Sequence, residues 1–491
     1  MSEVMLFIIV LIPVLWSILI PMLPFKKRGH MMIFIEAIVL INSILVWLLL
    51  WNRPEGTFTL LRFTGHLSVT FRLDGMACVF AGLVSVLWPL ATLYSFEYMK
   101  HEDHEKVFFM FYTMTYGVTL GIAMSGNILT MYFFYELLTL VTTPLVLHTL
   151  TREAILASRT YLYYSLGGAA FAFIGMIFVV VYGNSIDFIY GGVLHAGSYP
   201  GGDQVLLLIY VLAFMGFGVK AAICPFNSWL PKAGVAPTPV TALLHAVAVV
   251  KSGAFAIIRL TYYSFGVDFL RGTWAQYVVM GITMFTIIYG CSMAVKERHL
   301  KRRLAYSTIS NLSYILFGVT IMTPLGLVGA LAHLTAHAIM KICSFFCAGA
   351  VIYKTGRNYI YELDGFGRRM PKIFGIFTIS AFALMGVPGL AGFISKYYLA
   401  SAAVESGNAL AYFGVGAILI SAILTAIYMQ TIVVRAFFPQ AGFDYHTIDD
   451  VRDPNWMMVL PLTLFCIGML AYGVYSKPLI DLFTKIAYGA F

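Results

Sequence analysis

Long apolar segments recur along the whole chain, and short polar stretches separate them. A helix that crosses a bilayer needs about 20 mostly apolar residues, and on that rule the sequence predicts about fourteen spans. They lie near residues 4–24, 31–51, 76–98, 107–125, 127–150, 158–183, 204–230, 238–264, 274–295, 303–322, 327–353, 372–402, 409–435 and 456–476. We therefore expect an all-α, polytopic membrane protein.

Lysine and arginine are unevenly distributed among the polar connections. About twenty fall in the odd-numbered connections, against about six in the even-numbered ones and the C-terminal tail. The densest clusters are residues 296–303 and 354–372. Because basic residues collect on the cytoplasmic side, we expect both segments to be cytoplasmic. An even number of spans in the cell inner membrane then places both termini outside.

Two predicted spans are interrupted, and each also carries a lysine. In the seventh, Lys220 precedes the Pro-rich run 224–231; in the twelfth, the Gly/Pro run 386–389 precedes Lys396. A broken helix is tolerated in a membrane only where protein or a water-filled cavity covers its free backbone groups. Matching interruptions in two halves indicate inverted repeats, although Gly and Pro are common in membrane helices generally.

The spacing of the two interruptions defines a division of the chain. They are five spans apart, so two five-helix repeats over residues 107–264 and 265–435 would place them in equivalent positions. An odd number of helices inverts the second copy. We expect a three-helix segment over residues 1–106 before the repeats, and a fourteenth helix within residues 436–491 after them.

Ionisable side chains lie within the apolar segments, where they are costly and commonly functional. We expect ion translocation to depend on Glu136, Lys220, His245, Lys251, His333, His337, Lys341 and Lys396. The alternative for the lysines is that each extends to a headgroup. That explanation suits a lysine near a helix end.

Glu136 and Lys220 are the natural partners of one another, two helices apart. A carboxylate in the middle of a span must pair with a cation or become neutral. Such a pair can hold a mobile proton, because the lysine can lose a proton and the carboxylate can gain one when they separate. A purely structural buried ion pair is the alternative.

The histidines favour a proton relay. His333, His337 and Lys341 stand at i, i+4 and i+8, so they share one helix face. Two histidines at i, i+4 can also bind zinc, but the sequence lacks the HExxH pattern and places a lysine on the same face. His245 could be a hydrogen-bonded core residue, but its position between Lys220 and Lys251 favours a relay.

Composition limits the remaining possibilities. The chain is 60% hydrophobic and 11% charged, whereas soluble domains carry about 25% charged residues. The net charge of +9 is therefore no sign of nucleic-acid binding. No cysteine pair has the spacing of a zinc or iron–sulfur site, and we expect neither a metal nor a cofactor. If the chain belongs to an oxidoreductase, other subunits carry the electrons.

The run 220–246 resembles the antiporter-like family of membrane subunits, and residues 304–310 and 333–341 support the likeness. That family includes the large membrane subunits of respiratory complex I, the Mrp-type cation/proton antiporter subunits and the matching subunits of membrane hydrogenases. The resemblance covers about residues 70–435. It implies that Glu136 is the family's fifth-helix glutamate and Lys220 its seventh-helix lysine. His245 and Lys251 would lie on the bridging eighth helix, and the eleventh-helix relay would consist of His333, His337 and Lys341. Lys396 would be the terminal residue on the twelfth helix.

The resemblance is closest to the D subunit of Mrp and its hydrogenase counterpart, because Lys396 and Lys251 are both lysines. The sequence departs from the family pattern at Asn227, Lys232 and Gly234, which puts the cytoplasmic-side entrance in doubt. We expect a proton-translocating subunit, with sodium antiport as a further option, that works with other membrane subunits in the bilayer. The alternative is a free-standing secondary transporter of a small solute.

Overall fold

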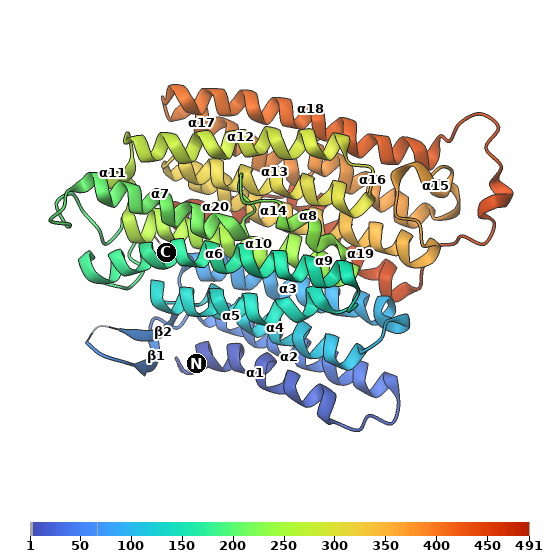
Figure 1. Cartoon of the computed structure of the whole chain (residues 1–491), viewed down its shortest axis with the longest axis horizontal. Coiled ribbons are helices and arrows are strands. Elements are labelled where there is room, and N and C mark those ends of the chain that lie inside the picture. Colours follow the sequence, from blue (N-terminus) through green and yellow to red (C-terminus); the bar gives the residue numbers. More distant parts are fainter. Residues whose placement is uncertain (1–2, 66, 491) are drawn as a thin grey trace.

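The helices of this protein run side by side in one bundle (Figure 1). The computed structural model describes residues 3–65 and 67–490. Its first half contains α1 (Met5–Met22), α2 (Arg28–Asn52), β1 (Thr57–Arg62), β2 (Ser68–Arg72), α3 (Gly75–Tyr98), η1 (Met99–His101), α4 (Glu105–Ala123), α5 (Ile128–Leu147), α6 (Arg152–Tyr182), α7 (Asp203–Lys220), α8 (Trp229–Lys232) and η2 (Ala233–Val235).

The second half continues the bundle. It contains α9 (Thr238–Ala242), η3 (Leu243–Val247), α10 (Val249–Ile258), η4 (Arg259–Phe265), α11 (Val267–Leu270), α12 (Trp274–Lys296), α13 (Leu300–Thr320), α14 (Pro324–Thr355), η5 (Ile360–Glu362), α15 (Phe366–Arg369), α16 (Pro371–Met385), α17 (Ala391–Glu405), α18 (Ala409–Phe437), η6 (Tyr445–Ile448), α19 (Trp456–Val474) and α20 (Lys477–Ala487).

Among the described residues, 11 helices are long and apolar enough to cross a membrane. This is a multi-pass membrane protein. Each of the other three predicted spans also coincides with helical structure: α4, α13 and the pair α16 and α17. Polar residues lower the hydropathy of α4 and α13, and the twelfth span is divided into two short helices. The count of fourteen crossings and the inverted repeats stay predictions.

The eighth span is helical but irregular. Two of its segments, η3 and η4, are π-helical, and α10 lies between them. Single π turns inside α-helices often occur at functional sites. The whole candidate span, Thr238–Phe265, is buried inside the protein. It is therefore the central helix of the bundle, and its π turns reorient the side chains that follow them.

Three features differ from the expected all-helical pattern. The polar segment after α2 forms an antiparallel hairpin, in which Thr57 of β1 pairs with Arg72 of β2. The C-terminal segment contains α20, which is too short to span and was not predicted. Lys301 and Arg303, expected in a loop, lie in the first turn of α13 and are 7% and 6% exposed.

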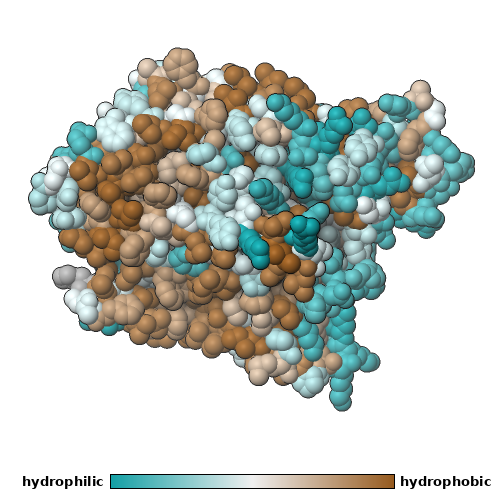
Figure 2. Space-filling model, viewed as in Figure 1, coloured by the Kyte–Doolittle hydropathy of each residue, from teal (hydrophilic) through white to brown (hydrophobic). Residues whose placement is uncertain are grey.

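Polar residues gather at one end of the bundle. Figure 2 shows hydrophobic residues over its flank and hydrophilic residues over the end that carries α15. The two basic connections meet there, because Leu300 N donates to Asn358 O (2.8 Å) and Ile360 N to Arg298 O (3.0 Å). The start of α1 and the β-hairpin lie at the opposite end (Figure 1). Both basic clusters therefore face the same side.

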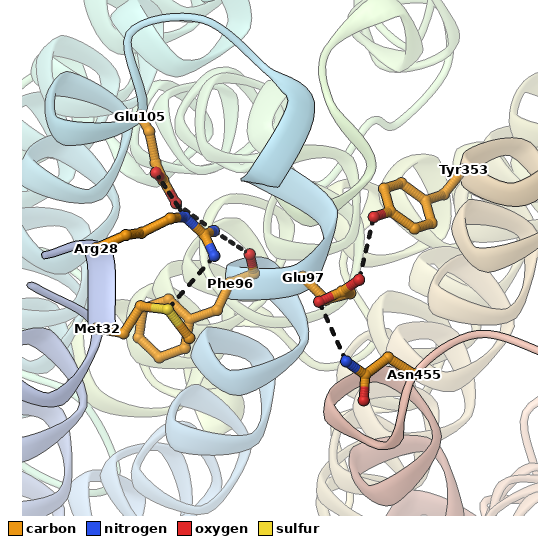
Figure 3. A network of polar contacts seen from close by, with 7 residues as sticks. All are labelled: Arg28, Met32, Phe96, Glu97, Glu105, Tyr353 and Asn455. Atoms are coloured by element: carbon orange, nitrogen blue, oxygen red, sulfur yellow. Dashed lines mark hydrogen bonds and ion pairs between the residues drawn. The ribbon is translucent and has the colours of Figure 1, made fainter. Parts of the chain in front are cut away.

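Polar contacts tie the first three helices to the rest of the bundle (Figure 3). Arg28 of α2 forms an ion pair with Glu105 of α4, with Nη2 2.5 Å from Oε1. Glu97 of α3 accepts a hydrogen bond from Tyr353 Oη of α14 (3.2 Å) and one from Asn455 Nδ2, just before α19 (3.5 Å). The contact of Tyr353 holds α3 against α14, the helix that contains His333 and His337.

Candidate functional site

The central span brings three predicted residues from distant helices into one line. Lys251 of α10 is fully buried, and its Nζ contacts Nδ1 of His337 on α14. The ring of His337 stacks on that of His333, one turn away, with centroids 5.8 Å apart and planes at 26°. The two histidines of α14 therefore lie on one side of the helix, the side that turns toward Lys251.

The line continues beyond His333 to α17. His333 Nδ1 lies 2.9 Å from Ser395 Oγ, and the neighbouring residue is Lys396. The ring of Tyr314 on α13 lies between the two groups, 5.0 Å from the ring of His333 and 5.4 Å from Lys396 Nζ. Nitrogen bases and hydroxyl groups thus follow one another from Lys251 to Lys396.

The break in the twelfth span positions Lys396. Its Nζ donates to the carbonyls of Leu384 (2.8 Å) and Met385 (3.0 Å), at the C-terminal end of α16. The last carbonyls of a helix have no partner within it, and their partial negative charge stabilises a cation. Gly386 ends α16 with a positive φ of 92°. A Cβ there would lie 3.0 Å from Lys396 Cδ, so glycine leaves room for the lysine.

Lys341 belongs to a side branch on the same helix. Its Nζ donates to Ser307 Oγ (2.6 Å) and to Leu304 O (3.2 Å) of α13. Ser307 Oγ lies 2.6 Å from Tyr428 Oη, which donates to Thr425 Oγ1 (3.2 Å) of α18. The predicted face of α14 therefore divides: the two histidines turn to α10 and α17, whereas Lys341 turns to α13.

The predicted direct ion pair between Glu136 and Lys220 is wrong for this structure: no contact within 4.0 Å joins them among the ion pairs of the described residues. The fully buried Lys220 ends α7, and its Nζ donates to the carbonyl of Tyr135 and lies 3.4 Å from that ring's centroid. Tyr135 precedes Glu136, so the two charges still interact. One carboxylate oxygen of Glu136 is buried and has no hydrogen-bond partner within the described part of the chain.

His245 lies between the two ends of the site, in the π-helical segment η3. It is fully buried, and by distance and angle no described residue forms a hydrogen bond with either ring nitrogen, although the backbone of Leu230 is close enough to act on the ring. Its ring packs against Phe345 of α14, with centroids 4.7 Å apart, and it interacts electrostatically with Lys341. Nearby, a Cβ at Gly253 would lie 2.6 Å from Ala221 N, so this glycine lets α10 pack against the break after Lys220.

Two of the three residues that depart from the family pattern have different environments. Asn227 is 4% exposed, and its Nδ2 has no partner among the described residues. Lys232, at the end of α8, is exposed. Lys301, which sequence reasoning placed in a loop, is buried beside this segment and donates to Ala236 O (2.9 Å). Its occurrence at the start of a predicted helix, next to an apolar run, was the available signal.

A buried ion pair was also missed. Arg259, the first residue of η4, is fully buried, and its Nη1 and Nη2 donate to Asp74 Oδ2 (2.6 Å) and Oδ1 (2.7 Å). Burial alone would raise the pKa of Asp74, but the Arg259 guanidinium outweighs it and holds that pKa below its usual value. The sequence feature that could have indicated this ion pair is Arg259 itself, an arginine late in an apolar span. Its partner, Asp74, lies 185 residues away in the sequence.

The chemistry available to this arrangement is proton exchange. Amines, imidazoles and hydroxyl groups can each take up and release a proton or conduct one along hydrogen bonds. Most of the buried ionisable groups near the line are bases, which repel metal cations when protonated. Among the described residues, no group of three or more His, Cys, Asp or Glu side chains could hold a metal ion.

Comparison with known proteins identifies the family. Residues 125–425 match the family described as NADH:quinone oxidoreductase/Mrp antiporter, transmembrane. Residues 62–109 match the one described as NADH-ubiquinone oxidoreductase (complex I), chain 5 N-terminus. The first match covers more than half of the chain and includes every predicted site residue, from Glu136 to Lys396.

Individual relatives extend the likeness over the whole chain. A probable K(+)/H(+) antiporter protein of Rhizobium meliloti is 29% identical over 99% of this chain, which spans about half (48%) of that relative's length. The NADH-quinone oxidoreductase subunit N of Desulforudis audaxviator is 28% identical over 83% of this chain and 82% of its own. A chain of the Mrp complex from Dietzia sp. has the same fold, with a TM-score of 0.85, 20% identity, and coverage of 99% and 97% of the two chains. The chain belongs to the NADH:quinone oxidoreductase/Mrp antiporter family of transmembrane proteins.

Proposed function

We propose that this chain is a proton-translocating subunit of a multi-subunit membrane complex. The observation that carries the proposal is the buried line in which Lys251 contacts His337 and His337 stacks on His333. A protonated amine against an imidazole nitrogen is a donor against an acceptor, and both groups are fully buried. Such a costly arrangement in a membrane protein marks a pathway for ions.

Each residue on the line has a distinct part. Lys251 donates its proton to Nδ1 of His337, and the ring then releases the proton on Nε2, which is buried without a partner among the described residues. His333 relays it toward Ser395 and Lys396. Lys396, held by two helix-terminal carbonyls, is the last charged site before the break in the twelfth span.

Glu136 and Lys220 form the input at the other end. Lys220 rests on the carbonyl beside Glu136 rather than on its carboxylate. Rotation of one lysine side chain would form the ion pair, and its return would separate the charges. Because the field of Lys220 favours the ionised carboxylate and separation favours the neutral one, this movement changes the proton occupancy of Glu136.

His245 connects the two ends. No described residue forms a hydrogen bond of normal geometry with its buried ring nitrogens, and buried polar groups are nearly always hydrogen-bonded to protein or water. We propose that water molecules reach His245 during transport and carry the proton between Lys220 and Lys251. The site is thus a relay with one hydrated step.

The surroundings follow from the same proposal. Several relatives are named as subunits of larger complexes, so we propose that other membrane subunits cover part of the apolar flank. The complex would lie in the cell inner membrane, with residues 296–303 and 354–372 in the cytoplasm and both termini outside. Sodium is the candidate counter-ion if the complex is an antiporter.

The test is proton flux in membrane vesicles that contain the assembled complex. We expect Lys251→Ala and His337→Gln to abolish flux while assembly stays intact, because each removes a member of the line. Lys232→Ala is the matched control, since that lysine lies in the adjacent motif but is exposed. Near-normal flux in Lys251→Ala would refute the proposed pathway. If the purified single chain takes up a small solute at full rate without other subunits, that result would favour a free-standing transporter.

A further inference from the structure

The side branch that begins at Lys341 continues beyond Thr425 into α12. Cys291 of α12 is fully buried, and its Sγ lies 3.8 Å from Thr425 Oγ1 and 2.8 Å from Ser421 Oγ, both on α18. The same Sγ donates to Ser310 Oγ of α13 (3.0 Å), which lies 3.3 Å from Ser421 Oγ. One thiol thus joins hydroxyl groups of α13 and α18, the two helices that hold the first part of the branch.

The branch returns to the histidine line at Tyr314. This tyrosine lies one turn after Ser310 on α13, and its Oη donates to Ile418 O of α18 (3.2 Å). Ser421 lies one turn after Ile418, and its hydroxyl group interacts with that of Tyr314. The ring of Tyr314 in turn lies 5.4 Å from Lys396 Nζ. The branch and the histidine line therefore reach the same lysine.

Two rows of proton-carrying groups consequently connect the same two ends of the site. The first runs from Lys251 through the two histidines to Lys396. The second starts at Lys341, which interacts electrostatically with Lys251, and runs through hydroxyl and thiol groups to Tyr314. Every side chain between Lys341 and Tyr314 on this second row is at most 1% exposed. The row is thus enclosed by protein over its whole length.

The contact between Thr425 and Cys291 is the longest hydrogen bond from Lys341 to Ser310 along this row. Thr425 Oγ1 accepts from Tyr428 Oη (3.2 Å) and donates to the carbonyl of Ser421 (2.7 Å). Its hydrogen therefore points along α18 and away from the sulfur. A hydroxyl hydrogen rotates while the heavy atoms stay in place, so its rotation toward Sγ connects the two parts of the row.

Hydroxyl groups also join membrane helices without carrying protons. Isolated pairs are sufficient for that purpose. Here the contacts follow one another through α13, α18 and α12, and they start from the fully buried amine of Lys341, which donates to two neutral oxygens, Ser307 Oγ and Leu304 O. A continuous row with an amine at each end is the arrangement that proton transfer requires, because each oxygen between them must both receive and release a proton.

We propose that the hydroxyl and thiol groups of α12, α13 and α18 form a second proton path from Lys341 to Lys396. Cys291 links α18 to α13 on this path, and rotation of the Thr425 hydroxyl opens it. The inference rests on the proposed function, because it takes proton translocation through Lys251 as its starting point. It assigns a role in transport to a cysteine and to serine and threonine residues outside the histidine line.

The proton balance of this path is simple. Lys341 gives one proton to Ser307, and each following hydroxyl or thiol group forms one new bond to hydrogen as it releases its own. Tyr314 then gives its proton to the neutral amine of Lys396. The amine of Lys341 ends neutral and that of Lys396 ends charged, and no group between them keeps a charge.

The test is proton flux in vesicles that contain the assembled complex, with His333→Gln interrupting the first row. We expect His333→Gln alone to retain part of the flux, because the second path remains. Adding Thr425→Val should abolish that flux, since valine has the shape of threonine but no hydroxyl group, whereas Thr425→Ser should preserve it. Thr119→Val is the matched control: Thr119 of α4 is also fully buried and donates to the carbonyl four residues earlier at 2.7 Å.

Cys291 provides an independent pair of variants. In the His333→Gln background, Cys291→Ala should abolish flux and Cys291→Ser should retain it, because serine keeps a donor and an acceptor. Loss of all flux in His333→Gln alone would overturn the proposal. It would also be overturned if Thr425→Val changes flux by the same factor with and without His333, as a purely structural role requires. Near-normal flux in Lys251→Ala is a different result, which refutes the proposed function itself.

Discussion

Removal of the Asp74 carboxylate is expected to destabilise the protein strongly. Asp74 precedes α3 and accepts a hydrogen bond from Ala77 N (2.9 Å), which caps the helix. It also holds both terminal nitrogens of the fully buried Arg259, at 2.6 and 2.7 Å. The guanidinium carbon lies 4.8 and 4.7 Å from the ring centroids of Phe188 and Tyr263, so the rest of its surroundings offers aromatic rings rather than a second carboxylate.

The magnitude follows from these contacts. Breaking one side of a buried ion pair costs about 3–5 kcal/mol, because the other charge is left desolvated. Loss of the helix cap contributes about 1 kcal/mol. Asp74→Ala loses both, whereas Asp74→Asn keeps a good capping residue and should cost about 1 kcal/mol less. In the double variant Asp74→Asn with Arg259→Met both charges are gone, so its cost should be less than the sum of the two single costs.

The assay is the free energy of unfolding in mixed micelles, obtained from denaturant titration. The same titration at several pH values isolates the charge of Asp74. Because Arg259 lowers the folded-state pKa of Asp74, the stabilisation is fully present above the unfolded pKa of about 3.9. It is lost as the pH falls through the lower folded pKa. This part of the acid dependence should be absent in Asp74→Asn.

Two results would refute this reasoning. If Asp74→Ala lowers the free energy of unfolding by less than about 1 kcal/mol, Arg259 does not depend on this carboxylate. If the double variant costs the full sum of the single variants, the two residues are not coupled.

Three further predictions concern function and topology. Cysteines introduced at residues 296–303 and 354–372 should react with a membrane-impermeant reagent only from the cytoplasmic side; labelling of either segment from outside contradicts the topology. Lys220→Arg should reduce proton flux in vesicles to well below wild type, because arginine does not release its proton. Glu136→Asp should retain much of the flux. Equal flux in the two variants would show that transport does not require deprotonation of Lys220. The chain should copurify with other membrane subunits, and a fully active single chain in detergent would contradict this.

The helical, multi-pass character of the chain could be predicted from the sequence. A spanning segment must be long, apolar and satisfied in its own backbone hydrogen bonds, so hydropathy alone places the helices. The interruptions of the seventh and twelfth spans were equally visible, because Pro and Gly act on their own backbone. The buried lysines and histidines of the candidate site were also identified, since a charge inside an apolar run is conspicuous wherever its side chain points. The buried Arg259 and Lys301 were not.

Short elements escaped prediction because local sequence determines them weakly. The β-hairpin is stabilised by pairing between Thr57 and Arg72 and by packing on the bundle. Helix α20 is too short to satisfy the length rule for a span. Lys301 and Arg303 occur in a polar cluster that is typical of a loop, and only the packing of α13 against its neighbours buries them.

The partners within the site were decided by tertiary structure alone. The period of α14 placed His333 and His337 on one face, but it could not show that Lys251, 86 residues before His337, meets that face. In the same way, Lys220 was expected on the Glu136 carboxylate but rests on the neighbouring carbonyl. A helical period fixes the direction of a side chain relative to its own axis. The partner depends on how helices remote in sequence cross, and that is set by the packing of the whole bundle.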